Sequence, residues 1–313
     1  MRKKKKMLLN KSYLENLVEK NKIYSKQGKI ASYIPELSKA REDNLGVYVV
    51  VKNGVEIGIG NYNMIFSIQS ISKILTFILA VLDRGEDEIF SKIGSEPSGD
   101  AFNSIIKLEV SKLKKPYNPM INAGAIGISS MIMGETSTER VERILKLVRL
   151  LAGNEEIHLM NEIYKSEKET GFKNIGIAYL LKNEGIIEGD VEVALDTYFK
   201  QCSIGITAKD LAHIGFCLAN KGKNSKGEVL LPEKICRYAI SLMTTCGLYD
   251  GSGDFALKCG IPTKSGVGGG LLSSVPNSLG IGFFSPPLDE NGNSLVGIKF
   301  LIDLSNELEL SIF

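Results

Sequence analysis

Strand-like patterns occur at both ends of this 313-residue chain, and helix-like patterns occupy the stretch between them. Near the start, residues 45–52 and 55–60 form two apolar runs joined by Asn53-Gly54, which is a strong hairpin signal. Four further short runs predict strands near the end, at 256–259, 264–267, 269–273 and 279–284. We therefore expect a mixed α/β (α+β) fold with one antiparallel sheet built from both termini and flanked by helices.

The stretch between the strands predicts an inserted, all-helical lobe. Helical spacing of apolar residues is found at 71–82, 137–152, 175–183, 191–201, 208–220 and 232–244, and again in a last helix at 295–308. The polar segment up to about residue 40 also reads as helical. No linker or repeat separates independent units, so we expect one domain over residues 1–313. Its sheet lobe would comprise residues 1–68 and 245–313 and its helical lobe residues 69–244, with an active site in the cleft between them.

The composition argues against several classes of protein. Lys and Arg exceed Asp and Glu by only two charges, so we expect no nucleic-acid partner. No apolar stretch is long enough for a membrane helix, and Met7-Leu8-Leu9 after the basic start is too short for the core of a signal peptide, which predicts a cytoplasmic location. The five cysteines and two histidines are spaced for neither a disulfide scaffold nor a zinc site, which predicts buried reduced thiols and no metal.

Ser70 and Lys73 form the most informative pair in the chain. They open the apolar run at 71–82, and their spacing of three places them on one face of a helix. A serine hydroxyl needs a base to become a nucleophile, and a lysine among apolar groups has a lowered pKa that suits this task. The structural alternative is a helix N-cap serine followed by a lysine that extends to solvent. The same spacing recurs in two polar segments, at Ser104/Lys107 and Ser111/Lys114.

A second motif supports the catalytic interpretation. Lys264-Ser265-Gly266 precedes Val267 and a glycine run, and Ser-x-x-Lys followed by Lys-Ser/Thr-Gly is typical of serine acyl-transfer enzymes of the β-lactamase and penicillin-binding type. In those enzymes a strand at the edge of the site supplies a backbone N–H to an oxyanion hole, and glycine permits close approach. The alternative for the glycine run is a bulge in a strand.

Over nearly its whole length the chain resembles the serine-dependent glutaminases, which have a β-lactamase-like fold. The matching segments are Ala31-Ser32-Tyr33-Ile34-Pro35-Glu36-Leu37, Phe66-Ser67-Ile68-Gln69-Ser70-Ile71-Ser72-Lys73, Glu96-Pro97-Ser98-Gly99, Asn118-Pro119-Met120-Ile121-Asn122-Ala123-Gly124-Ala125-Ile126, Ser166-Glu167-Lys168-Glu169-Thr170-Gly171, Tyr198-Phe199-Lys200-Gln201-Cys202-Ser203, Gly247-Leu248-Tyr249-Asp250 and Lys264-Ser265-Gly266-Val267. The resemblance implies hydrolysis of L-glutamine to L-glutamate and ammonia without a cofactor. It also implies a homo-oligomer, either a dimer or a tetramer.

The resemblance assigns roles to single residues. Ser70 matches the nucleophile, Lys73 its base and Tyr249 a tyrosine at the reacting centre. Val267 matches the residue whose backbone N–H completes the oxyanion hole with that of Ser70. The remaining matched positions bind the amino-acid end of the substrate or lie at the rim of the site, and they are Asn122, Glu167, Asn174, Tyr198 and, at the rim, Tyr33.

Each of these residues also has a structural alternative. Asn122 and Asn174 follow Pro119 and Gly171, where turn roles are common, and Glu167 lies in an alternating-charge run typical of a solvated helix end. Tyr198 and Tyr249 would by default be core aromatics with a satisfied hydroxyl. For the whole chain, two other functions remain open: a peptidase or β-lactam hydrolase of the same fold, and a non-catalytic amino-acid-binding module.

Overall fold

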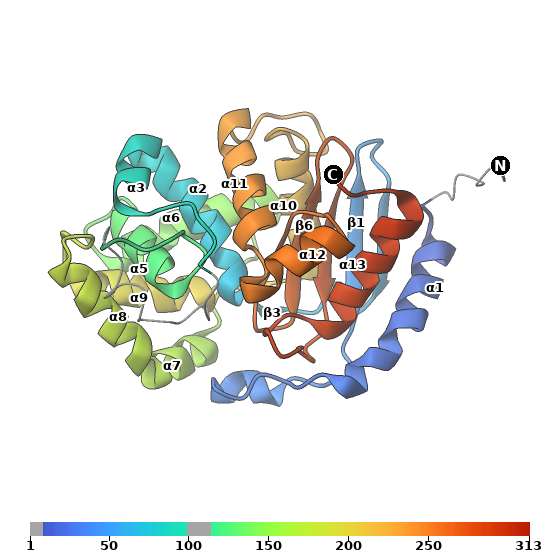
Figure 1. The fold of residues 1–313 in the computed structure, drawn as a ribbon, viewed down its shortest axis with the longest axis horizontal. Helices are drawn as coiled ribbons and strands as arrows, with labels where there is room; N and C mark the ends of the chain where they lie inside the picture. Colours follow the sequence, from blue (N-terminus) through green and yellow to red (C-terminus); the bar gives the residue numbers. More distant parts are fainter. Residues whose placement is uncertain (1–8, 99–113) are drawn as a thin grey trace.

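A five-stranded antiparallel sheet built from both ends of the chain forms one side of the molecule (Figure 1). The computed structural model describes residues 9–98 and 114–313. The order across the sheet is β2-β1-β7-β6-β5, and the strands are β1 (Gly46–Val51), β2 (Glu56–Gly60), β5 (Thr263–Ser265), β6 (Gly270–Val275) and β7 (Leu279–Phe284). The expected sheet and hairpin are therefore confirmed, and β1 pairs with β7 in a register that opposes Val51 to Leu279.

Helices cover both faces of this sheet, which explains why its strands read as nearly continuous apolar runs. Val47 and Val49 point into a cluster with the helices α1 (Lys11–Lys22) and α13 (Leu295–Leu308). The alternate residues of β1, Tyr48 and Val50, face Ala212 and Phe216 of helix α10 (Ala208–Ala219) on the other side. This alternation is the period-two pattern of a strand whose two faces are both buried.

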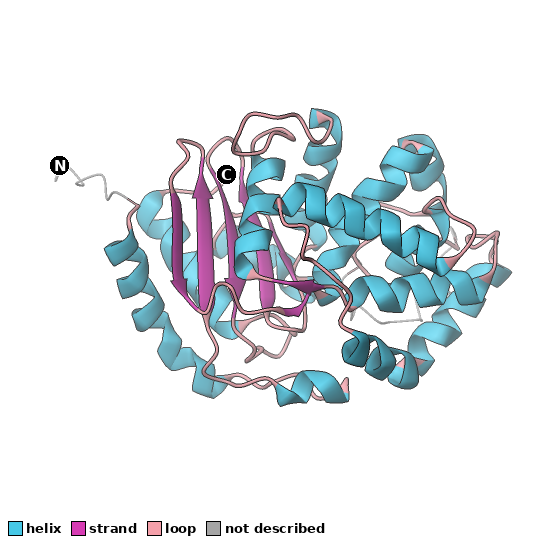
Figure 2. Cartoon of the chain, turned by 180° about the vertical axis from the view of Figure 1, so that it is seen from behind, coloured by secondary structure: helices cyan, strands magenta, loops and turns pink. Residues whose placement is uncertain are grey.

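The rest of the chain is mainly helical and packs beside the sheet, as the view from behind shows (Figure 2). Helix α2 (Ser72–Arg84) lies at its centre, and each residue from Ser72 to Val81 is buried. The helices around it are α3 (Glu86–Lys92), α5 (Asn122–Met131), α6 (Ser137–Ala152), α7 (Asn161–Thr170), α8 (Phe172–Asn183), α9 (Val191–Cys202) and α11 (Glu233–Cys246). A two-stranded ladder of β3 (Phe66–Ser67) and β4 (Gly205–Ile206) joins this part to the sheet lobe.

The prediction of a strand at 256–259 is wrong, because this run belongs to helix α12 (Ser252–Lys258). The helix buries Phe255 but leaves Leu257 exposed, and Lys258 forms an i,i+4 ion pair with Asp254. A run this short has no period that distinguishes a strand from a helix. The N-terminal segment is helical at α1 and in the 3₁₀ turns Ile23–Gln27 and Pro35–Lys39, with extended chain between the turns.

Helix α10 falls within the range expected for the helical lobe, yet it packs directly on the sheet. Glycines permit the contact, since a Cβ at Gly282 would lie 1.8 Å from the carbonyl oxygen of Ala208, and one at Gly215 would lie 2.4 Å from that of Ser273. The division into lobes at residues 69–244 stays a prediction.

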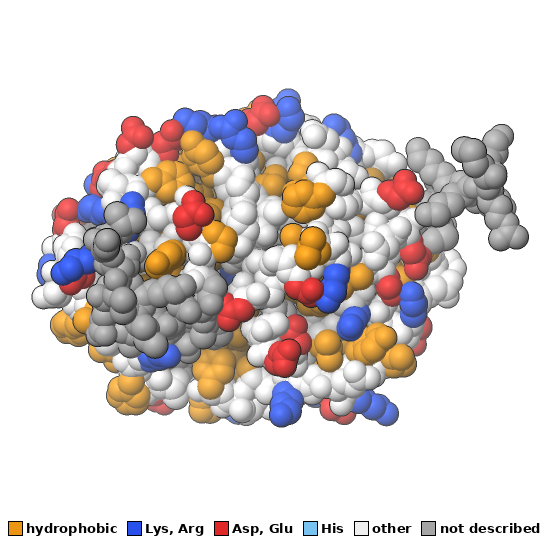
Figure 3. Space-filling model, viewed as in Figure 1, with side chains coloured by type: hydrophobic (Ala, Val, Ile, Leu, Met, Phe, Trp, Pro, Cys, Tyr) orange, Lys and Arg blue, Asp and Glu red, His pale blue; other side chains and the backbone are white. Residues whose placement is uncertain are grey.

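The surface and the buried thiols agree with the composition. All five cysteines are buried and free, as predicted. On the face shown in Figure 3, basic and acidic side chains are interspersed. Within residues 9–98 and 114–313, no helix has the length and apolar character that crossing a lipid bilayer requires. The basic start, Gly99, the pair Ser104/Lys107 and Ser111 lie outside the described residues.

Candidate functional site

Ser70 lies in a one-turn 3₁₀ helix, Gln69–Ile71, that leads directly into α2. The helix predicted from the apolar spacing is confirmed, with α-helical geometry from Ser72 onward. Gln69 adopts a φ of +49°, a left-handed conformation that non-glycine residues rarely take. The Ser72 hydroxyl donates a hydrogen bond to the Gln69 carbonyl at 2.7 Å and holds this bend. Strain of this kind is concentrated at functional sites.

Lys73 lies one turn after Ser70 and is completely buried. Its Nζ donates to the carbonyl of Met120 at 3.2 Å and to Oδ1 of Asn122 at 2.7 Å. Burial lowers the pKa of Lys73 to about 8, and the nearby carboxyl of Glu167 acts in the opposite direction. The structure therefore confirms the apolar environment predicted for this amine, because desolvation disfavours its charged form.

Asn122 and Asn174 connect this lysine to a second wall of the site. Asn122 is the first residue of α5, and its Nδ2 donates to Oδ1 of Asn174 on α8 at 2.9 Å. Gly124 brings the start of α5 close to the preceding loop, since a Cβ there would lie 1.9 Å from the carbonyl oxygen of Asn118. Both asparagines are thus in the first turns of helices, with their side chains turned toward each other.

Glu167 is buried in the site, whereas its neighbour Glu169 is exposed. Burial raises the pKa of Glu167 to about 7, while a hydrogen bond from the Gln69 side chain and the charge of Lys73 lower it. The Gln69 amide nitrogen also donates to the Ser67 hydroxyl at 2.8 Å. The alternative of a solvated helix end is wrong for Glu167, because helix α7 packs against both the 3₁₀ turn Pro35–Lys39 and helix α9 and the Glu167 side chain is buried.

A small cavity of about 100 Å³ brings most of the predicted residues together. Its lining includes six of them: Tyr33, Ser70, Asn122, Glu167, Asn174 and Tyr198. Tyr198 is buried and its pKa lies well above 10 because of that burial, whereas Tyr33 is 56% exposed and forms the outer edge. The volume is below that of a typical pocket for a drug-sized ligand, so the cavity suits a small polar molecule.

Tyr249 comes to the neighbourhood of Ser70 from a segment nearly 180 residues later in the chain. It begins a 3₁₀ turn, Tyr249–Gly251, with a φ of +54°. Burial raises its pKa to about 12, and hydrogen bonding to Ser70 and Ser265 acts in the opposite direction. A second cavity of about 100 Å³ lies beside the Tyr249 ring and is also lined by Met120.

Val267 is held next to the Ser70 segment by the glycines on either side of it. A Cβ on Gly266 would lie 2.7 Å from the carbonyl oxygen of Ile68, and one on Gly268 would lie 2.7 Å from that of Ser67. Only glycine allows the turn after β5 to come this near the chain before Ser70. The glycine run is therefore the turn between β5 and β6 rather than a bulge within a strand, and Gly269 takes a φ of +93° in it.

Sequence reasoning missed two residues at this site. Gln69 is a substantial part of the cavity wall and contacts Glu167, but its bend leaves no trace in the sequence pattern. Lys264 was noted only as part of a motif, yet its side chain is fully buried and its Nζ lies 4.6 Å from the centre of the Tyr249 ring. A lysine inside a short predicted strand was the available signal.

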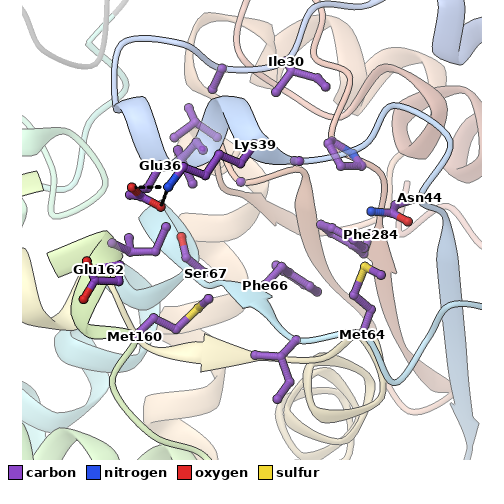
Figure 4. A pocket seen from close by; sticks show the side chains of 18 of the residues that line it. Ile30, Glu36, Lys39, Asn44, Met64, Phe66, Ser67, Met160, Glu162 and Phe284 are labelled. Carbon is purple, nitrogen blue, oxygen red and sulfur yellow. Dashed lines mark hydrogen bonds and ion pairs between the residues drawn. The ribbon is translucent and has the colours of Figure 1, made fainter. Parts of the chain in front are cut away.

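A larger cavity, of about 620 Å³, is lined by Ser67, three residues before Ser70 (Figure 4). Phe66, Phe284 and Met160 give it a mainly apolar wall, and a Glu36–Lys39 ion pair lies at its edge. Val267 lines this cavity, but Ser70 and Lys73 do not. The smaller cavity, which contains Ser70, is therefore the candidate active site.

In the part of the chain that the structure describes, no cluster of three or more His, Cys, Asp or Glu side chains is placed to hold a metal ion.

In a comparison with known proteins, this chain matches the glutaminase family model over residues 28–313. Glutaminase 2 of Clostridium perfringens is 52% identical over 304 residues, covering 97% of this chain and all of the relative. The glutaminase of Fusobacterium nucleatum is 53% identical over 303 residues, covering 97% and 100%. A solved structure of a probable glutaminase from Bacillus subtilis, complexed with 6-diazo-5-oxo-L-norleucine, is 36% identical with a TM-score of 0.90 and covers both chains fully. The predicted β-lactamase-like fold is confirmed by these matches together with the sheet.

Proposed function

Because the chain belongs to the glutaminase family and is an enzyme that hydrolyses glutamine, we propose that Ser70 is its nucleophile and Lys73 the base. The hydrogen bonds of Lys73 support this most directly. A neutral amine has two N–H groups and one lone pair. Since Met120 and Asn122 accept the two N–H groups, the lone pair is left for the proton of the Ser70 hydroxyl.

In the proposed reaction, Ser70 Oγ attacks the side-chain amide carbon of glutamine as Lys73 takes its proton. The amide nitrogen must then gain a proton to leave as ammonia, and we assign this transfer to the Tyr249 hydroxyl, whose pKa is influenced by the nearby Ser70 side chain. This leaves a glutamyl ester on Ser70. Water, deprotonated by the same base, attacks the ester and releases glutamate.

The negative charge on the amide oxygen needs stabilisation in both steps. We assign this to the backbone N–H groups of Ser70 and Val267, in line with the close contact that Gly266 and Gly268 permit between the two segments. A preorganised oxyanion hole lowers the barrier because its donors do not have to reorient during the reaction.

The amino-acid end of glutamine would occupy the part of the cavity near Glu167. Its ammonium is paired with the Glu167 carboxylate, which is buried and therefore interacts strongly with a charge. Asn122, Asn174 and Tyr198 supply the hydrogen bonds to the carboxylate and amine, and Tyr33 covers the rim.

Substitution of the nucleophile tests this function. Ser70→Ala should lower kcat for ammonia release by roughly a thousandfold or more, because catalytic residues that act as a unit lose most of their rate enhancement when one of them is removed. Ser104→Ala and Ser111→Ala, which carry the same spacing to a lysine, should be close to neutral. Assays with glutamine and a chromogenic β-lactam separate the glutaminase from other enzymes of this fold. Wild-type turnover by the Ser70→Ala protein would exclude the proposed mechanism.

Two further properties are proposals that follow from the resemblance. We expect a homo-oligomer, either a dimer or a tetramer, and light scattering of the purified protein measures its mass; a monomeric mass would contradict the expectation. A cytoplasmic location is expected as well, and fractionation of the source cells tests it.

A further inference from the structure

Lys264 is a buried lysine that has no part in the proposed reaction. It lies on β5, 0% exposed, in a strand where a lysine side chain is costly to bury. Burial lowers its pKa well below the ordinary value, and the charge of Lys73 acts in the same direction. A residue this unfavourable in the core requires an explanation from its contacts.

Two of its three contacts are with the segment that carries Tyr249, and the third is with β5 itself. Lys264 Nζ donates to the carbonyl of Gly247 at 3.0 Å and to that of Ser265 at 2.7 Å. Its remaining side faces the Tyr249 ring, 4.6 Å from the ring centre. Gly247 is two residues before Tyr249, and a Cβ on it would lie 1.9 Å from the carbonyl oxygen of Thr263, so this stretch is pressed against β5.

The strained conformation of Tyr249 explains why such an anchor is useful. A φ of +54° is costly for a tyrosine and persists only where the surroundings enforce it. Ser252 accepts from the backbone N–H of Leu248 at 3.0 Å and donates to the Tyr249 carbonyl at 2.9 Å, which holds the far side of the turn. Lys264 fixes the chain just before the turn through the Gly247 carbonyl, and its amine packs against the Tyr249 ring.

We propose that Lys264 is a positioning residue that keeps the Tyr249 hydroxyl near Ser70 by binding the Gly247 carbonyl and packing against the face of the Tyr249 ring. The inference rests on the proposed function, because it assigns Lys264 an effect only through the proton transfer given to Tyr249. Lys264 does not itself touch the substrate in this scheme.

The test is a double-mutant cycle between Lys264→Met and Tyr249→Phe. Methionine fills a similar volume without the two N–H donors, so the fold should persist. Lys264→Met should lower kcat by roughly 10–100-fold, the range for a small misplacement of a reacting group. Glutamate affinity, measured by calorimetry, should stay within about threefold, because the substrate cavity contains other residues. In the Tyr249→Phe background the same change should cost less than about twofold further, since coupled residues are not additive.

Controls separate this role from a structural one. Lys258→Met removes an exposed lysine that pairs with Asp254 and should leave kcat unchanged. Lys264→Gln, which retains two N–H donors, should fall between wild type and Lys264→Met, and it replaces the methionine variant in the cycle if that protein unfolds. Additive losses, an unchanged kcat in Lys264→Met, or a parallel loss of glutamate binding would each overturn the inference. Tyr249→Phe with wild-type kcat would also overturn it, while Ser70→Ala would still test the nucleophile independently.

Discussion

The side-chain oxygen of Asn122 accepts a hydrogen bond from Lys73 Nζ at 2.7 Å. The nitrogen of the same amide donates to Asn174 at 2.9 Å. A residue proposed to bind substrate thus also orients the proposed base. Because one amide serves both, we expect substrate binding and the position of the Lys73 amine to depend on each other.

The lowered pKa of Lys73 predicts an activity that rises with pH. The base acts only when neutral, so kcat should increase about tenfold per pH unit below a pKa of about 8 and then level off. Glu167, with a pKa raised to about 7, must be ionised to bind an ammonium, so kcat/KM should fall further below pH 7. A pH profile of ammonia release measures both.

Substitution of the proposed base is a separate test. Lys73→Arg keeps a charge but cannot accept a proton near neutral pH, and we expect it to be as inactive as Lys73→Ala. An active arginine variant would contradict the assigned role.

The contrast between two neighbouring glutamates tests the assignment of the ammonium partner. Glu167→Gln should weaken glutamine binding by about 2–4 kcal/mol, the range for removing one partner of a desolvated charge pair. Glu169→Gln changes an exposed carboxylate and should have little effect. Calorimetric titration with glutamate, together with KM for glutamine, gives the comparison. Equal effects of the two substitutions would show that the wrong carboxylate has been chosen.

Substrate length should matter strongly. With its ammonium and carboxylate bound at the Glu167 end, asparagine is one methylene too short to bring its amide carbon to Ser70 Oγ. A misplacement of ~1 Å can cost about a hundredfold, so asparagine should be a very poor substrate. Similar values of kcat/KM for the two amides would mean that the cavity does not hold the amino-acid end in one place.

The packing of helix α10 on the sheet predicts that a single added methyl group lowers the stability of the protein. Gly282→Ala places a Cβ 1.8 Å from the Ala208 carbonyl oxygen, and the displaced helix should lower the free energy of unfolding by about 1–3 kcal/mol. Gly176→Ala is the matched control. It lies in helix α8 with no atom within 4 Å of an added Cβ, so alanine should stabilise the protein by about 0.5–1 kcal/mol. Urea unfolding of both variants measures the difference, and a neutral Gly282→Ala would show that α10 can move away from β7 at little cost.

Helices were predictable from the sequence wherever apolar residues recurred with helical spacing along the whole segment. Helices α6 and α13 agree with the predicted ranges residue for residue, because apolar stripes and polar faces alternate cleanly along them. Helix α5 was missed because it is apolar all round and contains Gly124 and Gly127, which leaves no stripe to detect. Helix α7 was missed for the opposite reason, since most of its residues are charged or polar.

Apart from the Ser70/Lys73 pair and the Lys264-Ser265-Gly266 motif, the site was predictable only through the resemblance to a family. No local property distinguishes Glu167 from Glu169, because Glu167 is buried in a helix that packs against segments distant in sequence, among them a turn more than a hundred residues earlier in the chain. The left-handed bend at Gln69 is likewise imposed by its surroundings. Residues whose state depends on distant segments cannot be derived from local sequence, and the residues around Ser70 are of this kind.

The pairing of β1 with β7 has a consequence for how the protein is made. Ser70, Lys73 and the asparagines are synthesised early, but Tyr249, Lys264 and Val267 lie in the last quarter of the chain. Contacts so distant in sequence form slowly, because a long loop must be closed before they contribute to stability. A nascent chain should therefore carry its proposed nucleophile for most of its synthesis without the rest of the proposed site around it. Under the proposed mechanism, we expect catalysis to begin only after β5, β6 and β7 have joined the hairpin made first.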